Sequence, residues 1–260
     1  MIHKIHVCGT RGSFPQTENR YMRYGSDSSC YLLDGEDAVF IDAGTGIIKA
    51  GPLVKDRKEI HILLSHLHID HMLGLFECPF LYDREKIVHI YGETRNAPVK
   101  EMLETIIAPP FWPLKLSEFP ADIRFHKIEE GKSFQINDLQ VTSKRSFHPD
   151  EALLFVIEDG KHRIGYACDY EYGKDKKKEA VKFFEACDLL IFDGNEMIEE
   201  VREGWGHSSW KQGLAIKEKA KIETLIISHH GYEQDDMTLE EEEKKAKGCL
   251  YAKEGMVIGL

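Results

Sequence analysis

Residues 60–71 read Ile60-His61-Ile62-Leu63-Leu64-Ser65-His66-Leu67-His68-Ile69-Asp70-His71, so that an apolar run passes directly into three histidines and an aspartate. A short apolar run of this kind is typical of a buried strand. We expect the strand to end at Ser65 and a helix to begin near Asp70. Imidazole nitrogens and carboxylate oxygens suit zinc and similar divalent ions. The segment therefore predicts a metal-binding loop that follows a buried strand.

The spacing within this loop permits two metal ions. In an extended segment His66 and His68 point the same way, because side chains alternate along the chain. Where the chain turns into a helix, Asp70 and His71 can face a neighbouring point. The alternative is a histidine-rich surface loop, which the preceding apolar strand disfavours. Four such groups would also be costly as inert core, because buried polar groups need partners.

Three further potential ligands stand at or near the ends of predicted strands. His148 follows Ser146-Phe147, and Asp169 and His229 each end an apolar run. Each position alone is weak evidence, because polar residues are common in turns. Together with the loop they complete a set of candidate metal ligands: His66, His68, Asp70, His71, His148, Asp169 and His229.

Two adjacent histidines, His229 and His230, compete for one ligand position. The sequence Ile227-Ser228-His229 repeats the pattern of Leu64-Ser65-His66, in which an apolar strand is followed by serine and histidine. We therefore expect His229 to be the ligand. His230 would then lie behind it or contact the substrate.

Composition limits the partners of the chain. It has 260 residues, 42% of them hydrophobic, and 34 basic against 45 acidic residues give a net charge of −11. Such a charge disfavours binding to extended nucleic acid or to an anionic membrane. No apolar run approaches the roughly 20 residues needed to span a bilayer, and the N-terminus has the alternation of a strand rather than a signal peptide. We expect a cytoplasmic protein whose six cysteines are reduced and mostly buried.

The order of predicted elements favours mixed sheets with helices outside. Strands at 153–157 and 163–167 read as a hairpin. Proline-rich residues 109–113 make the segment 94–120 either a lid or a packed surface loop, and its role stays open. Predicted helices cover 99–107, 174–186, 208–221 and 238–247, and a last strand lies within 255–260.

The motif His66-Leu67-His68-Ile69-Asp70-His71, together with Asp42, His148, Asp169 and His229, resembles the metallo-β-lactamase-fold hydrolase superfamily. The resemblance runs in order along essentially the whole chain. It implies an α/β fold of one domain, residues 1–260, in which two mixed β-sheets flanked by helices form a four-layer αβ/βα sandwich.

The resemblance also implies how the ligands divide between two divalent ions, zinc first and manganese or iron as alternatives. Asp169 would bridge the ions, and Asp42 would steady the ligand loops. Asp70 is counted among the catalytic residues as well as the ligands. One ion would be held by His66, His68 and His148, and the other by Asp70, His71 and His229.

Further segments resemble the phosphodiesterase branch, which includes tRNA 3′-processing endonucleases and cyclic phosphodiesterases. They are residues 9–15, residues 147–171, and Asp193-Gly194-Asn195-Glu196 followed by Gly206-His207-Ser208-Ser209. In that branch a histidine protonates the leaving oxygen and a glutamate orients it. Here these would be His207 and Glu196. Alternatively, His207 only precedes the helix at 208–221.

We therefore expect a phosphodiesterase that uses a metal-bridging hydroxide to cleave a small diester, a cyclic nucleotide or cyclic ribose phosphate. The branch's endonucleases grip tRNA with a long basic, glycine-rich arm, which this sequence lacks. The alternatives are a tRNA 3′-processing-like endoribonuclease, or a thioester or lactam hydrolase on the same fold. Phe111, Trp112 and Trp205 are candidates for stacking on a base or sugar, and Arg11 for contacting phosphate. A homodimer is compatible with the sequence.

Overall fold

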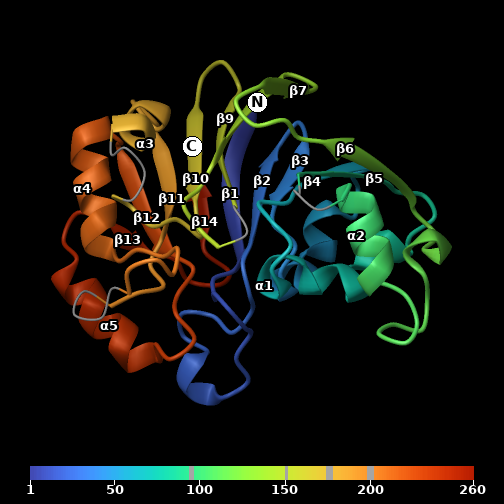
Figure 1. The fold of residues 1–260 in the computed structure, drawn as a ribbon, viewed down its shortest axis with the longest axis horizontal. Helices are drawn as coiled ribbons and strands as arrows, with labels where there is room; N and C mark the ends of the chain where they lie inside the picture. Colours follow the sequence, from blue (N-terminus) through green and yellow to red (C-terminus); the bar gives the residue numbers. More distant parts are fainter. Residues whose placement is uncertain (94–96, 150–151, 174–177, 198–201) are drawn as a thin grey trace.

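The computed structural model describes residues 1–260 except 94–96, 150–151, 174–177 and 198–201. The described residues form two sheets of seven strands each (Figure 1). The first, in the order β14-β1-β2-β3-β4-β5-β6, contains β1 (Ile2–Gly9), β2 (Cys30–Gly35), β3 (Ala38–Ile41), β4 (Glu59–Leu63), β5 (Ile87–Gly92), β6 (Asp122–Lys127) and β14 (Val257–Gly259). The second, in the order β13-β12-β11-β10-β9-β8-β7, contains β7 (Ser133–Ile136), β8 (Leu139–Arg145), β9 (Leu153–Glu158), β10 (Arg163–Ala167), β11 (Leu189–Asp193), β12 (Thr224–Ser228) and β13 (Leu250–Tyr251).

Helices lie outside the two sheets, which Figure 1 shows side by side in the middle of the molecule. The first sheet is covered by α1 (Ile69–Met72), α2 (Val99–Ile106) and the 3-10 helices η2 (Thr45–Val54), η3 (Leu73–Glu77), η4 (Pro79–Tyr82) and η5 (Leu116–Glu118). The second is covered by α3 (Lys178–Phe183), α4 (Trp210–Ala220) and α5 (Asp236–Lys245), and η1 (Asn19–Tyr21) contacts α5. Between the sheets, side chains such as Val39 and Leu63 of one meet Phe155 and Ile226 of the other in one buried cluster. The predicted four-layer sandwich is confirmed.

Both sheets are mixed, and their parallel parts decide where the site lies. Strands β3 to β6 run parallel in the first sheet, and β10 to β13 run parallel in the second. Ligand sites in open α/β sheets lie outside the carboxyl ends of parallel strands. The residues that follow β3, β4, β10 and β12 are therefore the ones expected to meet at one edge of the sandwich.

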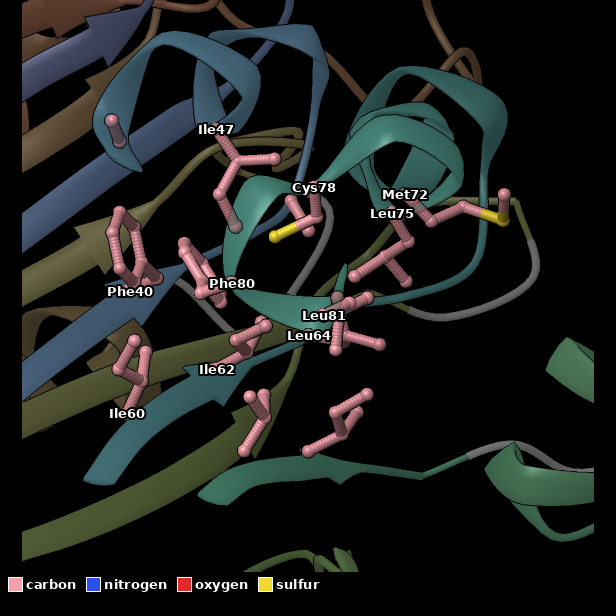
Figure 2. Packing of buried hydrophobic residues seen from close by; sticks show 14 of the residues in the cluster. Phe40, Ile47, Ile60, Ile62, Leu64, Met72, Leu75, Cys78, Phe80 and Leu81 are labelled. Carbon is pink, nitrogen blue, oxygen red and sulfur yellow. The ribbon is translucent and has the colours of Figure 1, made fainter. Parts of the chain in front are cut away.

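A second buried cluster packs the helices onto the first sheet and holds the metal-binding loop at both ends. Figure 2 shows part of it, with Leu64 just before the loop and Met72 just after it among its members. Both side chains are almost fully buried. Phe40 of β3 stacks on Phe80 in the same cluster, with ring centroids 5.4 Å apart. The histidines thus lie on a loop whose two ends are fixed by apolar packing.

Most predicted elements are present. β9 and β10 pair as the expected antiparallel hairpin. The helices predicted at 99–107, 208–221 and 238–247 appear as α2, α4 and α5 within a few residues of their expected ends. The helix predicted at 174–186 appears as α3, and its first predicted residues, 174–177, lie outside the described residues. In the segment 94–120, Trp112 packs against Phe76 and donates its indole N–H to the Tyr82 hydroxyl at 3.3 Å. Five of the six cysteines are buried and none forms a disulfide. Among the described helices, none is long and apolar enough to cross a membrane.

The outer cluster gives a test of the packing. We expect Phe40→Ala to lower the free energy of unfolding by about 3–5 kcal/mol, because it empties a buried aromatic site. Phe111→Ala removes a ring that is 70% exposed, and should change stability by no more than about 0.5 kcal/mol. Denaturant titration of both variants measures the difference. Equal losses would contradict the packing described here.

Candidate metal centre

Three residues at the site share an unusual backbone conformation. Asp42, Asp169 and His229 follow β3, β10 and β12, and their φ angles are 59°, 56° and 56°. Non-glycine residues seldom adopt this left-handed region, and such strain persists where surrounding structure enforces it, often at functional sites. Each of these strands therefore ends in an abrupt change of direction that places a polar side chain at the shared edge.

One group of histidines comes from both sheets. The potential ligand atoms of His66, His68 and His148 lie within 4.8 Å of one another. The His66 ring centroid is 4.4 Å from that of His68 and 5.0 Å from that of His148. His68 stands in extended conformation just before α1, so it lies on the same side of the loop as His66, as the alternation predicts.

A second group lies beside the first. Nε2 of His71 is 3.2 Å from Nε2 of His229, and Oδ2 of Asp70 is 3.2 Å from each of these nitrogens. Asp169 faces both groups: its Oδ2 is 2.9 Å from His71 Nε2 and 3.1 Å from His229 Nε2. Its other oxygen is 3.2 Å from His148 Nε2. The structure thus brings all seven predicted ligands together, in two groups that share Asp169.

The electrostatics of these groups suit divalent cations. Burial favours neutral carboxyls, but His71 holds the pKa of Asp70, and His229 that of Asp169, well below the usual range. Burial would lower the pKa of His229, yet the carboxylates of Asp169, Asp193 and Asp70 raise it to about 10. Nε2 of His66 is buried without a hydrogen-bond partner among the described residues. Imidazole nitrogens and carboxylate oxygens thus converge at a place where positive charge is stabilised. This is the donor set of a divalent metal site.

Asp42 holds the ligand loop, as predicted, by accepting four hydrogen bonds. Ser65 donates its backbone N–H at 2.7 Å and its hydroxyl at 2.9 Å. His71 donates its Nδ1–H at 2.7 Å, which leaves Nε2 for a metal. The Tyr166 hydroxyl, from the other sheet, donates at 2.6 Å. A carboxylate that orients a ligand histidine in this way fixes both the ring and its tautomer.

The partner of His207 differs from the prediction. Nδ1 of His207 donates to Oδ2 of Asp193 at 3.0 Å, whereas Glu196 accepts a 2.8 Å hydrogen bond from Arg202. Asp193 is the last residue of β11 and reaches the shared edge directly, while Glu196 lies three residues beyond the strand. Burial would lower the pKa of His207, but Asp193 outweighs it and raises that pKa. Asp193, which the sequence analysis missed as a functional residue, could have been found by the strand-end rule that gave Asp169.

Two other sequence interpretations are settled by burial. His230 donates Nε2–H to the Ala252 carbonyl at 2.9 Å, and burial lowers its pKa to about 3, so it faces away from the cluster that contains His229. Arg11 does not contact a substrate phosphate as suggested, because it is fully buried. Its guanidinium instead donates to the carbonyls of Tyr21, Gly25 and Gln234.

A cavity of about 600 Å³ opens beside the metal centre. Ser13, from the segment 9–15, lines one wall, and its backbone N–H donates to Asp70 Oδ2 at 2.7 Å. Of the three aromatic residues considered for stacking, Trp205 lines this cavity and Phe111 and Trp112 do not. Six of the lining residues are Ser13, Asn195, Arg202, Trp205, His207 and Tyr232.

Comparison with known proteins identifies the family. The model of the β-lactamase superfamily domain matches residues 38–230, which is more than half of the chain. The chain therefore belongs to the β-lactamase superfamily and is a hydrolase of the metallo-β-lactamase fold, as its motifs indicated. Divalent metal ions are the cofactors that this fold and the histidine and aspartate groups support.

Individual relatives are distant but cover nearly the whole chain. Ribonuclease Z of Archaeoglobus fulgidus is 22% identical, over 94% of this chain and 93% of its own. The structure of YhfI from Bacillus subtilis has a TM-score of 0.76 at 20% identity, and that of the human short-form tRNase Z has 0.70 at 17%, each covering 98% of both chains. The ribonuclease names favour the alternative of an RNase Z-like enzyme over our first expectation of a small diester.

Asp42 gives a test of the metal centre. We expect Asp42→Asn to weaken zinc binding by about 10- to 100-fold, because His71 loses the carboxylate that orients it. Tyr166→Phe removes only one of the four donors to Asp42 and should have a smaller effect. Titration of metal-free protein with Zn²⁺ measures both affinities.

The matched control is Asp34→Asn, which removes a carboxylate that pairs with Lys4 and His6 outside the cluster. Its zinc affinity should equal that of the unmodified protein. If Asp42→Asn and Asp34→Asn bound zinc equally well, Asp42 would have no role in orienting the ligands.

Proposed function

We propose that this chain is a phosphodiesterase that uses two divalent metal ions, zinc by preference, with His207 as the general acid. The observation that carries the proposal is the His207–Asp193 pair beside the shared carboxylate. His207 Nδ1 lies 3.0 Å from Asp193 Oδ2 and 4.0 Å from Asp169 Oδ1. A thioester hydrolase has less need of a proton donor at this point, because a thiolate leaves without protonation.

The predicted ligands would divide between the two metal ions. His66, His68 and His148 would hold one ion, Asp70, His71 and His229 the other, and Asp169 both. When bound, such a pair of ions supplies a nucleophilic water at neutral pH and neutralises the phosphate oxygens. Residues that only hold and orient these groups include Asp42 and Ser65.

His207 carries the proton. Asp193 accepts the hydrogen bond from Nδ1, which fixes the ring and stabilises its charged form, as the raised pKa indicates. Nε2 is then the atom that delivers a proton to the departing oxygen of the diester. General acid catalysis of this kind contributes about 10²- to 10⁴-fold to a rate.

We expect His207→Ala to retain its metal but to lose about 10²- to 10⁴-fold in kcat on a dinucleotide, whose alkoxide leaving group needs a proton. The loss should be much smaller on bis(p-nitrophenyl) phosphate, because p-nitrophenolate leaves without protonation. Steady-state kinetics and metal analysis of the same preparations measure both effects.

His3→Ala, which removes an exposed histidine on β1, serves as the matched control and should leave both rates unchanged. Equal losses on the two substrates would show that His207 is not the proton donor. Hydrolysis that persisted after complete chelation of the metal would overturn the proposed function itself.

Two substrate types follow from different observations. The names of the curated relatives favour RNA, since ribonuclease Z proteins recur among them. A small nucleotide diester is favoured by the length of the chain: the alignment with the Archaeoglobus enzyme spans 302 residues, so the relative contains stretches absent from these 260. The alignment with the metallo-hydrolase YhfI spans only 235 residues, so that relative does not have such long additional stretches. The net charge of −11 also opposes binding of a long polyanion.

Parallel assays separate these substrates. An RNase Z-like enzyme should cleave a 3′-extended tRNA with a kcat/KM at least tenfold above that for a 2′,3′- or 3′,5′-cyclic nucleotide. The rate on tRNA should fall steeply as salt rises, because phosphate contacts release counterions. The reverse order of kcat/KM, with little dependence on salt, would assign the small diester.

A further inference from the structure

The loop of residues 204–206 holds Trp205 at the rim of the cavity that contains His207. The backbone N–H groups of Gly204 and Gly206 donate to one carboxylate oxygen of Glu171, at 2.7 and 3.1 Å. Glu171 is itself buried, with an exposed fraction of 6%. Both glycines have φ angles of 85°, which a side chain would strain. These two hydrogen bonds, which we call the clamp at Glu171, therefore fix the backbone on both sides of Trp205.

This loop packs directly on the metal centre. A side chain at Gly206 would collide with the ring and backbone of His148, so the backbone there lies against a candidate ligand. Trp205, one residue earlier, lines the same cavity as His207 and is 58% exposed.

An ion pair supports the indole from one side. The guanidinium carbon of Arg202 is 4.3 Å from the centre of the Trp205 ring. Arg202 donates in turn to Glu196 at 2.8 Å, and Glu196 is buried. Glu196, Arg202 and Trp205 thus form a stack anchored in the protein. Glu196 acts in it as a positioning residue for Arg202.

The rest of the cavity suits a flat polar ring next to a phosphate. Tyr232 lines it and is 52% exposed. The side-chain nitrogen of Asn195, another lining residue, is buried without a hydrogen-bond partner among the described residues. Because Glu196 and Glu233 line the cavity with Arg202, charge alone offers a phosphate little attraction beyond the metal ions. Stacking on an aromatic ring is worth about 1–3 kcal/mol per base and needs no net charge.

We propose that Trp205 is the platform on which the base of the nucleotide next to the scissile phosphate stacks. The substrate class is then a diester that carries a nucleobase at this position, whether a small nucleotide or an RNA end, and not a base-free ribose or alkyl diester. This inference rests on the proposed phosphodiesterase function and narrows its substrates.

Two diesters with the same leaving group test it: thymidine 5′-(p-nitrophenyl phosphate) and ethyl p-nitrophenyl phosphate. We expect the unmodified, metal-loaded protein to prefer the thymidine diester in kcat/KM. Trp205→Ala should reduce that preference at least about fivefold, the loss of one stacked base, and Trp205→Phe should retain most of it. Phe111→Ala, an exposed aromatic outside the cavity, should leave the preference unchanged. A loss in Trp205→Ala that is equal for both diesters overturns the proposal.

Binding separates this inference from the proposed function. By calorimetry, thymidine 5′-monophosphate should bind at least about fivefold more tightly than 2-deoxyribose 5-phosphate, and Trp205→Ala should abolish the difference. If neither diester were cleaved but this difference held, the platform would stand and the phosphodiesterase function would fail. Equal affinities for the two ligands overturn the platform, whatever the protein hydrolyses.

Discussion

The rest of the metal centre depends on the contacts that the Asp169 carboxylate makes. One oxygen lies against His148 and the other against His71 and His229, so a single buried group touches imidazoles from three segments of the chain. A buried carboxylate is expensive unless positive charge or hydrogen bonds surround it. Its place is set by Asp193, which accepts a hydrogen bond from the Asp169 backbone at 2.8 Å. The same Asp193 orients His207, so the proposed proton donor and the Asp169 carboxylate have a common support.

The two sheets make this sharing feasible, because the ligands come from both. The contact between Tyr166 of β10 and Asp42 after β3 links the sheets at the site itself. The inter-sheet core fixes their separation, and the outer cluster of Figure 2 fixes the ends of the ligand loop at Leu64 and Met72. Dense packing of this kind resists small displacements. The centre therefore depends on apolar side chains that lie well outside it.

The sequence predicted the seven candidate ligands but missed several contacts between distant segments of the chain. The loop from His66 to His71 is contiguous, so its chemistry is visible without the fold. Asp193 and Glu196 are three residues apart, and only the end of β11 shows that the first reaches His207. Arg11 is a similar case: its three carbonyl acceptors lie in η1 and in two loops that the sequence does not place beside it. The clamp at Glu171 also joins segments more than thirty residues apart.

The cavity and the net charge together limit how a substrate can be recognised. A long RNA is bound chiefly through its phosphates, by lysines and arginines along a groove. Of the charged residues that line this cavity, Arg202 is already paired with Glu196, and Glu233 adds a second carboxylate. Under the proposed function, attraction for phosphate would therefore be concentrated at the metal site, where the scissile group would bind. Any affinity for the remainder of the substrate has to come from uncharged contacts, and the exposed faces of Trp205 and Tyr232 are the largest of these in the cavity wall.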